Sequence, residues 1–381
     1  MLEDKKIAIV YDWIDKWGGV ERVLLTLHEM FPQATFYTSY TDSSTAPWSK
    51  ELSIQSSFIQ RLPVFLKKSR IYSLLLYPFA FESFDFSSYD LVISVTSSFA
   101  KSIITKPGTV HICYLLTPTR FLWTHTSEYI QNDFQKTSSG LFRNYLKKWD
   151  LVSSQRPDRM ISLSDTAKKR CRTYYKRDSQ VIYPPFDIDY WNKIKSRITN
   201  NKLQINFKFQ ISNKTKYFLV VSRLEPYKKV DLAIAVFNRL PVKTLVVVGV
   251  GSQEHYLKKS ANKNIVFVPY VSDEELAYLY SNAEALLMPQ EEDFGYVSLE
   301  AQFFGCPVIA FEKGGATETI TVNKTGLFFH SQDSESLSKT LDQFHTISYN
   351  FKLQTQKFGP ENVKQFGAEI FKKKFLEAIT E

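Results

Sequence analysis

Short apolar runs alternate with amphipathic stretches along most of the chain. A continuous apolar run of roughly four to eight residues is typical of a strand buried on both faces, and apolar residues every three or four positions are typical of a helix. In the first half, the amphipathic stretch Val20–Met30 predicts a helix. The runs there that predict strands are Ile7–Tyr11, Ala34–Thr38, Leu91–Val95, Val110–Leu115 and Arg159–Leu163.

The second half repeats this alternation. Its strand-like runs are Tyr217–Val221, Thr244–Val248, Ile265–Pro269, Ala285–Met288, Pro307–Phe311 and Gly326–Phe329. The helical patterns among them are Val230–Arg239, Asp273–Ser281 and Ser334–Phe344. Strands that alternate with helices predict a parallel sheet covered on both faces, so we expect two Rossmann-like, doubly wound α/β domains.

The paired prolines Pro184 and Pro185 interrupt regular structure and mark a domain boundary. We expect a first domain over residues 1–185 and a second over 186–361. The Lys- and Asn-rich stretch Asn192–Lys216 is interpreted as a linker or a loose first element. The tail, residues 362–381, predicts an amphipathic helix; its apolar residues at helical spacing are Phe366, Ile370, Phe371 and Phe375.

The composition limits the classes of protein to consider. A length of 381 residues fits two or three domains. No apolar run approaches the roughly 18 residues that span a bilayer, and no signal-peptide pattern precedes the first strand, so a cytoplasmic location is expected. The widely spaced Cys113, Cys171 and Cys306 favour reduced, buried thiols. The net charge of +9 suits phosphorylated ligands or an anionic membrane, whereas the sequence has no zinc-finger or RNA-binding signature, so nucleic acid is not an expected partner.

Two glutamates flank a predicted helix start within Pro289–Pro307. Glu292 precedes a Phe-Gly turn, and Glu300 lies about two helical turns into the helix. The first turn of a helix has free N–H groups and the positive end of the dipole, so the amides of residues 295–297 should favour anionic oxygens. A carboxylate can also accept two hydrogen bonds from a diol. Together these features indicate a sugar nucleotide, with Glu300 on the ribose and Glu292 on the transferred sugar. A solvated helix glutamate is the alternative for Glu300, and Glu291 and Asp293 are expected to be exposed.

Two cations follow the first strand of the second domain. Arg223 and Lys228 lie within Ser222–Lys229, at the carboxyl end of that strand. Two cations there can clamp a diphosphate and stabilise a leaving group that gains negative charge. A solvated surface pair is the alternative interpretation.

Glycines follow three other predicted strands. Gly18 and Gly19 come after the first strand, where ligands of α/β sheets bind, which favours a ligand-facing loop. For Gly249 and for the pair Gly314-Gly315, a plain turn and a ligand contact are both open.

Other chemistries lack their signatures in the sequence. The six histidines show no metal-ligand spacing, and the chain has no Gly-x-Ser-x-Gly elbow and no Gly-Lys-Ser/Thr phosphate loop. Metal centres, serine hydrolases and P-loop kinases are therefore not expected.

Taken in order, these motifs resemble glycosyltransferase family 4, retaining enzymes of the GT-B fold. The Arg223/Lys228 pair, the Glu292-to-Glu300 spacing and the Gly314-Gly315 turn match that family's donor-site signature. The first half looks like a narrower group, the bacterial mannosyltransferases of polysaccharide and lipopolysaccharide assembly. The segments that carry this likeness are Tyr11–Trp13, Gly18–Arg22, Asp90–Ser94, Ala100-Lys101, His111–Tyr114, Thr117–Trp123 and Val181–Pro185.

The resemblance implies two domains facing across a cleft, with the tail helix crossing back to the first domain. The first would bind the acceptor, with Lys101 and Arg120 as contacts, and the second would bind the donor. Catalytic roles fall to Glu292, Arg223 and Lys228. The implied donor-binding residues are Gly18, Gly19, Ser222, Arg223, Lys228, Gly249, Tyr270, Val271, Glu292, Phe294, Gly295, Tyr296, Val297 and Glu300.

The implied reaction is a retaining transfer of a hexose that needs no metal or other cofactor. The favoured donor is GDP-mannose, with a UDP-hexose or UDP-N-acetylhexosamine as the alternative. The acceptor would be a hydroxyl of a glycan or lipid-linked molecule in cell-surface polysaccharide synthesis.

One position departs from the family's pattern. Where the family has a histidine in Cys-His-Thr-Pro, this chain has Leu116, and the nearby His125 is out of register. This departure favours, as the second hypothesis, a non-catalytic subunit or sensor that binds a sugar nucleotide or glycan. A glycan phosphorylase on the same fold would need a lysine site for pyridoxal phosphate, and none is visible in the sequence.

The segment Phe58–Leu76 mixes cations with apolar residues. Such a segment can rest on an anionic bilayer, here the cytoplasmic face of the plasma membrane. A pair of core helices with a solvated basic face is the alternative.

Overall fold

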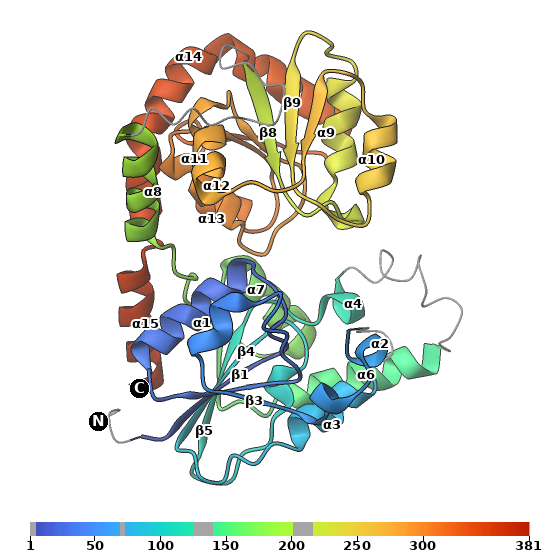
Figure 1. The fold of residues 1–381 in the computed structure, drawn as a ribbon, viewed down its shortest axis with the longest axis vertical. Coiled ribbons are helices and arrows are strands. Elements are labelled where there is room, and N and C mark those ends of the chain that lie inside the picture. Colours follow the sequence, from blue (N-terminus) through green and yellow to red (C-terminus); the bar gives the residue numbers. More distant parts are fainter. Residues whose placement is uncertain (1–4, 69–72, 125–139, 201–215, 381) are drawn as a thin grey trace. The chain divides into compact units, whose positions relative to one another are not determined.

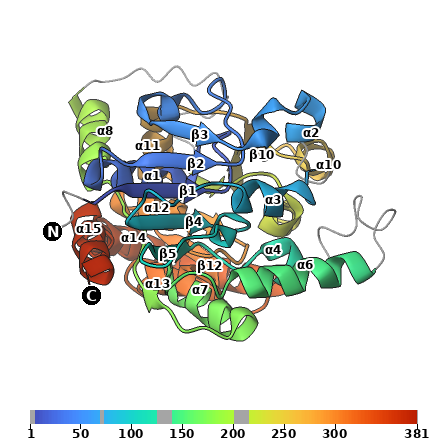
Figure 2. The same cartoon turned by 90° about the horizontal axis from the view of Figure 1, so that it is seen from below.

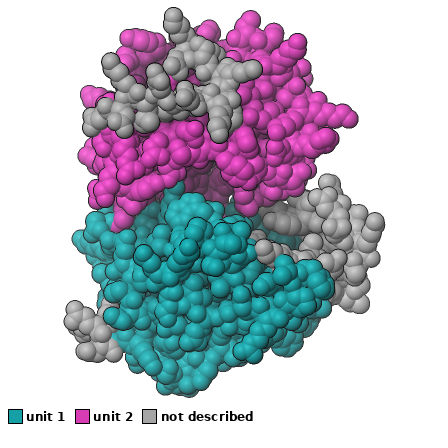
Figure 3. Space-filling view, viewed as in Figure 1, with its two compact units in different colours: residues 1–185, 369–381 teal, residues 186–368 magenta. Residues whose placement is uncertain are grey.

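The computed structural model shows two α/β units, each built on one parallel sheet (Figure 1). One unit comprises residues 1–185 and 369–381, and the other comprises residues 186–368 (Figure 3). The structure describes residues 5–68, 73–124, 140–200 and 216–380. Within those residues, no helix is both long and apolar enough to cross a membrane.

The first unit has a seven-stranded parallel sheet in the order β3-β2-β1-β4-β5-β6-β7. Figure 2 shows the first five of these strands side by side in that order. The strands are β1 (Ile7–Tyr11), β2 (Thr35–Thr38), β3 (Ile54–Ser56), β4 (Leu91–Thr96), β5 (Val110–Leu115), β6 (Arg159–Ser162) and β7 (Gln180–Val181). The central strands β1 and β4 are buried along their whole length, as expected of parallel strands covered on both faces.

Helices and single turns connect these strands. The helices are α1 (Gly19–Met30), α2 (Val64–Lys68), α3 (Leu76–Glu82), α4 (Arg120–Trp123), α6 (Gly140–Ser153), α7 (Asp165–Arg170) and, from the far end of the chain, α15 (Ala368–Thr380). The 3-10 turns are η1 (Pro47–Glu51), η2 (Phe58–Arg61) and η3 (Ala100–Ser102), and η5 (Cys171–Tyr175) is a π-helical turn.

The second unit has a six-stranded parallel sheet in the order β10-β9-β8-β11-β12-β13. Its strands are β8 (Tyr217–Val221), β9 (Thr244–Val248), β10 (Ile265–Val268), β11 (Leu286–Met288), β12 (Val308–Phe311) and β13 (Gly326–Phe329). Its helices are α8 (Ile188–Asn200), the 3-10 turn η6 (Pro226–Lys228), α9 (Val230–Phe237), α10 (Glu254–Ser260), α11 (Asp273–Asn282), α12 (Tyr296–Phe303), α13 (Ala316–Thr319) and α14 (Ser334–Lys364).

The tail joins the first unit through aromatic and polar contacts. The rings of Phe371 and Phe375 on α15 lie 5.8 and 6.2 Å from the ring of Tyr114 on β5. Arg159 donates a hydrogen bond of 2.8 Å to the carbonyl of Ala378. Two Rossmann-like domains with a last helix returning to the first, the GT-B arrangement, were predicted from the sequence, and this fold is confirmed.

Several details differ from the predictions. Residues 192–200, the start of the stretch interpreted as a linker or a loose first element, belong to helix α8, in which Trp191 and Ile194 are buried. Residues 201–215 of that stretch lie outside the described residues. The tail is not one helix: α14 continues to Lys364, a turn follows, and α15 starts at Ala368. Ile370 is 40% exposed and does not belong to the buried face. The short strands β3 and β7 were not predicted, and the three cysteines are free and buried as expected.

Candidate functional site

The second sheet has a topological switch point between β8 and β11. The chain passes from β8 outward through β9 and β10, and then returns to β11 on the other side of β8. Open α/β sheets bind ligands outside the carboxyl ends of the strands at such a point, because the loops diverge there. The segments that follow β8 and β11, helix α12 included, carry most of the residues predicted to bind the donor.

The Lys228 ammonium and the Glu292 carboxylate form an ion pair across this switch point. Lys228 ends the turn η6 after β8, and Glu292 lies in the loop after β11. Their side chains are 11% and 15% exposed, so both charges are mostly removed from water but can still be reached from it. A cation and an acid held together in this way can bind a phosphate and a neighbouring hydroxyl.

Arg223 lies beside this pair through a shared aromatic neighbour. Its guanidinium donates a hydrogen bond of 2.6 Å to the Tyr227 hydroxyl. The Lys228 ammonium lies 5.3 Å from the centroid of the same Tyr227 ring. The structure therefore brings Arg223, Lys228 and Glu292 to one edge of the sheet. Tyr227 was not predicted as a site residue, although it lies between Arg223 and Lys228 in one short loop.

The glycines after β9 and β12 are explained by backbones that approach one another closely. A Cβ on Gly249 would lie 2.0 Å from the carbonyl oxygen of Ser222, and one on Gly314 would lie 2.2 Å from that of Glu292. Both have positive φ, and Gly315 N–H donates to the Glu292 carbonyl at 2.7 Å. These contacts require glycine without any ligand. They also fix the main chain at Glu292.

Helix α12 begins where the sequence indicated. Gly295 precedes it with a φ of 87°, and Tyr296 is its first residue. Tyr296 and Val297 are half-buried in the first turn, whose amides have no intrahelical acceptors. Phe294 is 3% exposed, and its ring lies 5.5 Å from that of Phe366. The side chain of Phe294 therefore anchors the loop in the core, and only its backbone is available to a ligand.

Glu300 is buried within helix α12 and has a partner. Glu300 as a whole is 4% exposed, and its carboxylate accepts a hydrogen bond of 3.0 Å from the Tyr280 hydroxyl on α11. A buried carboxylate needs such a donor, and Tyr280 was not predicted. The expectation that Asp293 is exposed is wrong, because that residue is only 8% exposed, and Glu291 is half-buried.

The remaining predicted residues of this unit lie at the same edge. Ser222 follows β8, and its hydroxyl donates to the Arg223 carbonyl at 3.0 Å. Tyr270 and Val271 follow β10, and Tyr270 is 75% exposed. An exposed ring at the end of an outer strand is available for stacking on a base.

The switch point of the first unit, between β1 and β4, is occupied by a side chain of the protein. The buried Asp12 carboxylate accepts hydrogen bonds from the Thr96 hydroxyl and from the backbone N–H groups of Ser97, Phe99 and Ala100, each at 2.8 Å. An internal anion thus uses the amides that follow β4. The Asp12 carboxylate therefore fixes the loop after β4. The glycine-rich loop at this edge of the sheet is the one between β1 and α1.

Gly18 and Gly19 stand at the start of helix α1. Glu21, the third residue of the helix, accepts a hydrogen bond from the Gly18 N–H, as in one half of a capping box. Burial raises the pKa of the Glu21 carboxyl to about 7. Gly18 therefore has a structural partner in Glu21, and contact with a diphosphate stays a prediction.

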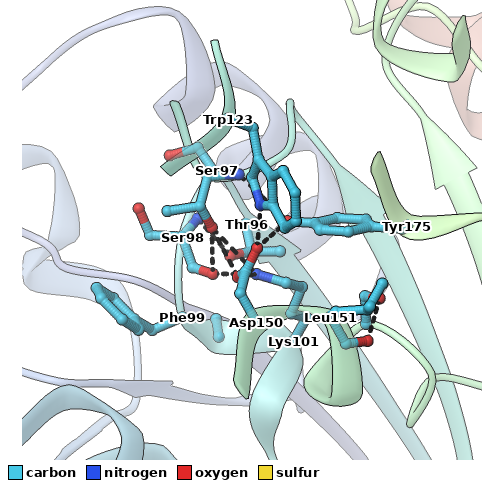
Figure 4. Close-up of polar contacts among 12 residues, drawn as sticks. Thr96, Ser97, Ser98, Phe99, Lys101, Trp123, Asp150, Leu151 and Tyr175 are labelled. Carbon is cyan, nitrogen blue, oxygen red and sulfur yellow. Dashed lines mark hydrogen bonds and ion pairs between the residues drawn. The ribbon is translucent and has the colours of Figure 1, made fainter. Parts of the chain in front are cut away.

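The structure corrects the prediction for Lys101. Its side chain is completely buried, and its ammonium lies 2.6 Å from the Asp150 carboxylate (Figure 4). The same carboxylate accepts hydrogen bonds from Thr119, Trp123 and Tyr175, at 2.8, 2.7 and 2.9 Å. Lys101 is thus part of a buried polar network and is not placed to contact an acceptor.

Arg120 is the first residue of α4 and is half-buried, so it remains a candidate contact. Leu116 is also half-buried and follows β5, where its N–H donates to the Thr96 carbonyl. His125 lies outside the described residues. His111 is fully buried, and desolvation lowers its pKa to about 3, so it is a neutral core side chain.

Over the described ranges, no group of three or more His, Cys, Asp or Glu side chains could hold a metal ion.

One protein-family model matches most of the second unit. Residues 201–358 match the family model "Glycosyl transferases group 1", a stretch that contains the whole switch-point site. A 41.2 kDa protein from the cps region of Klebsiella pneumoniae is 28% identical over 178 residues, which cover 46% of this chain and 47% of that protein. Alpha-1,3/1,6-mannosyltransferase ALG2 of Kluyveromyces lactis is 27% identical over 261 residues, with 53% and 48% covered. The chain spans about half the length of these curated relatives.

Solved structures resemble the chain over almost its full length. HepE of Anabaena in complex with UDP has a TM-score of 0.70 at 16% identity, over 98% of this chain and 99% of that one. Sucrose-phosphate synthase from Thermosynechococcus elongatus also has a TM-score of 0.70 at 16% identity, over 99% and 98%. The fold is therefore that of the GT-B glycosyltransferases. Within this fold, residues 201–358 carry the match to the group 1 glycosyl transferases.

Proposed function

We propose that the protein is a retaining glycosyltransferase that moves a hexose from a nucleotide diphosphate sugar to an acceptor hydroxyl. The observation that carries the proposal is the Lys228–Glu292 pair, with Arg223 beside it, at the switch point of the unit that matches the family. The second unit would bind the donor, and the first, with Arg120, would bind the acceptor.

The proposed reaction breaks the bond between the sugar C1 and the diphosphate oxygen and forms a bond from the acceptor oxygen to C1. Lys228, Arg223 and the first-turn amides of α12 would stabilise the negative charge that grows on the departing diphosphate. The acceptor proton would pass to a leaving phosphate oxygen on the same face of the sugar, which retains the configuration at C1. Glu292 would bind sugar hydroxyls, and Glu300 would bind the ribose.

Two relatives bear on the donor. The similarity to a mannosyltransferase, ALG2, favours mannose as the transferred sugar. The fold neighbour HepE was solved with UDP and with UDP-glucose, which keeps a UDP-hexose as the alternative donor. We favour GDP-mannose and a glycan or lipid-linked acceptor of cell-surface polysaccharide synthesis.

Thermal-shift measurements against GDP-, UDP-, ADP- and dTDP-sugars test this proposal. A ligand at 100 times its dissociation constant should stabilise the fold by about 2.7 kcal/mol, so one nucleotide class should raise the melting temperature clearly above the others. Product formation with that donor should follow. Binding without turnover across plausible acceptors would favour the non-catalytic subunit or sensor, and no binding by any of them would contradict a donor site.

The acceptor side of the proposal includes contact with an anionic membrane. An apolar-basic patch on the first unit consists of Phe58, Arg61, Val64, Phe65, Lys67, Leu75 and Phe79. Its five apolar side chains are between 43% and 67% exposed. Residues 69–72 of the predicted segment lie outside the described residues. Apolar side chains interleaved with cations can insert at a bilayer surface while the cations pair with anionic headgroups.

Replacing Phe65 with serine should weaken binding to vesicles of phosphatidylcholine and phosphatidylglycerol roughly tenfold, since burying one Phe is worth about 1.5–3 kcal/mol. Vesicle sedimentation measures this. Val242→Ser, at a 93% exposed apolar residue of the second unit, is the control and should change nothing. Equal binding by wild type and Phe65→Ser, or equal binding to vesicles of phosphatidylcholine alone, would exclude this patch as an anionic-membrane contact.

A further inference from the structure

Gln290 is a buried polar residue beside the Lys228–Glu292 pair. It follows β11 and is 2% exposed. Its Nε2 donates a hydrogen bond of 2.9 Å to Glu292 Oε1, the oxygen that also pairs with the Lys228 ammonium. Its own carbonyl oxygen, Oε1, is buried and has no hydrogen-bond partner among the described residues.

The charge of Glu292 fixes which way the Gln290 amide points. Only the NH₂ end can face a carboxylate, because a carbonyl turned toward it would bring two acceptors together. The consequence is an unsatisfied carbonyl in the protein interior, which lowers stability. An apolar side chain of the same length would avoid that loss. A buried polar residue that lowers stability in this way indicates a requirement other than folding.

We propose that Gln290 is a positioning residue for sugar transfer, which orients the Glu292 carboxylate beside Lys228 for contact with the donor sugar. With two donors on Oε1, the carboxylate group can no longer rotate, and the direction of Oε2 is set as well. The inference rests on the proposed transferase function. Gln290 itself acts through Glu292 and not on the diphosphate.

Gln290→Met removes the hydrogen bond but keeps the length and burial of the side chain. Its melting temperature should change little, because removal of the unsatisfied carbonyl offsets the loss of the hydrogen bond to Glu292. The kcat/KM for the sugar nucleotide should fall about 10- to 100-fold, the range that a hydrogen bond to a charged group is worth. The affinity for the free nucleoside diphosphate should stay the same, because that ligand lacks the sugar.

Gln290→Glu places a second carboxylate against Glu292. Two carboxylates this close share a proton, so the pair should titrate with a raised pKa. The folded state then binds the extra proton more tightly than the unfolded chain does. Both the stability of this variant and its rate of sugar transfer should therefore increase as the pH falls. In Gln290→Glu combined with Glu292→Gln, this additional pH dependence of stability should disappear.

Gln302 provides the matched control. It is also fully buried in the second unit, but its amide donates to the Thr319 carbonyl at 2.9 Å and its carbonyl accepts from Asn362. Gln302→Met should lower the melting temperature without changing the affinity for nucleoside diphosphate or the pH profile of transfer.

The outcomes separate this inference from the proposed function. Full transfer activity in Gln290→Met, or a loss that only parallels a lower melting temperature, overturns the inference and leaves the transferase proposal intact. If the wild type transfers no sugar from any donor, the transferase proposal fails. The pH dependence of stability in the single and double variants then decides whether Gln290 orients Glu292: an undiminished pH dependence in the double variant overturns it.

Discussion

Replacing Lys228 with alanine is expected to lower kcat for sugar transfer about 100- to 1,000-fold, the usual cost of removing one group that stabilises developing negative charge. The ammonium lies at the switch point, pairs with Glu292 and is only 11% exposed, so water cannot take its place efficiently. Steady-state kinetics with the donor identified by thermal shift measures this change in kcat. The affinity for free nucleoside diphosphate should fall as well.

Lys258→Ala is the matched control for this experiment. Lys258 also pairs with a glutamate, at 2.6 Å, but on helix α10, where its side chain is 48% exposed. An exposed pair of this kind contributes little, so turnover and stability should change only slightly. Unchanged turnover in Lys228→Ala would refute the diphosphate clamp.

Replacing Asp150 with alanine is expected to destabilise the first unit by about 3–5 kcal/mol, the cost of breaking a buried ion pair. The carboxylate is 1% exposed and binds Lys101, Trp123 and Tyr175 (Figure 4). It also accepts a hydrogen bond from the Thr119 hydroxyl. Its loss leaves the Lys101 charge buried without its counterion and releases the segment that leads into α4. Urea unfolding, followed by hydrogen exchange in peptides from β4 and β5, measures the loss for this unit alone.

Two variants check that the effect comes from the unpaired charge. Lys101→Met combined with Asp150→Leu should be less destabilising than Asp150→Ala, because no charge is left in the interior. Asp178→Ala, which breaks an exposed pair with Lys168 at 3.6 Å, should cost less than about 1 kcal/mol. A small loss for Asp150→Ala, similar to that for Asp178→Ala, would contradict the proposed role of the network.

The strands were predictable where an uninterrupted apolar run is buried on both faces, as in Ile7–Tyr11 and Tyr217–Val221. The strands β3 and β7 have three and two residues and lie at the edges of the sheet, so they carry too little apolar pattern to be found. Residues 192–200 of helix α8 were interpreted as part of a linker or a loose first element because the polar residues of this helix outnumber the few that are buried. Trp191 packs against Phe304, more than a hundred positions away, and local composition does not show that contact.

The charged residues of the candidate site could be chosen from the sequence because they follow predicted strands. The interaction partners of these residues could not be chosen from the sequence, because the pairing depends on which strands are neighbours in the sheet. Lys228 and Glu292 are brought together only because β8 lies next to β11. Lys101 shows the opposite failure: a cation that suggested an acceptor contact is neutralised by Asp150 from helix α6, 49 residues further along.

A crystal structure of the protein with GDP, and another with UDP, would test the central claim most directly. The account predicts diphosphate density at the carboxyl ends of β8 and β11, within hydrogen-bonding distance of Lys228 and Arg223 and beside the first turn of α12. Its ribose should lie against Glu300. A diphosphate bound elsewhere on the second unit, with the Lys228–Glu292 pair untouched, would contradict it.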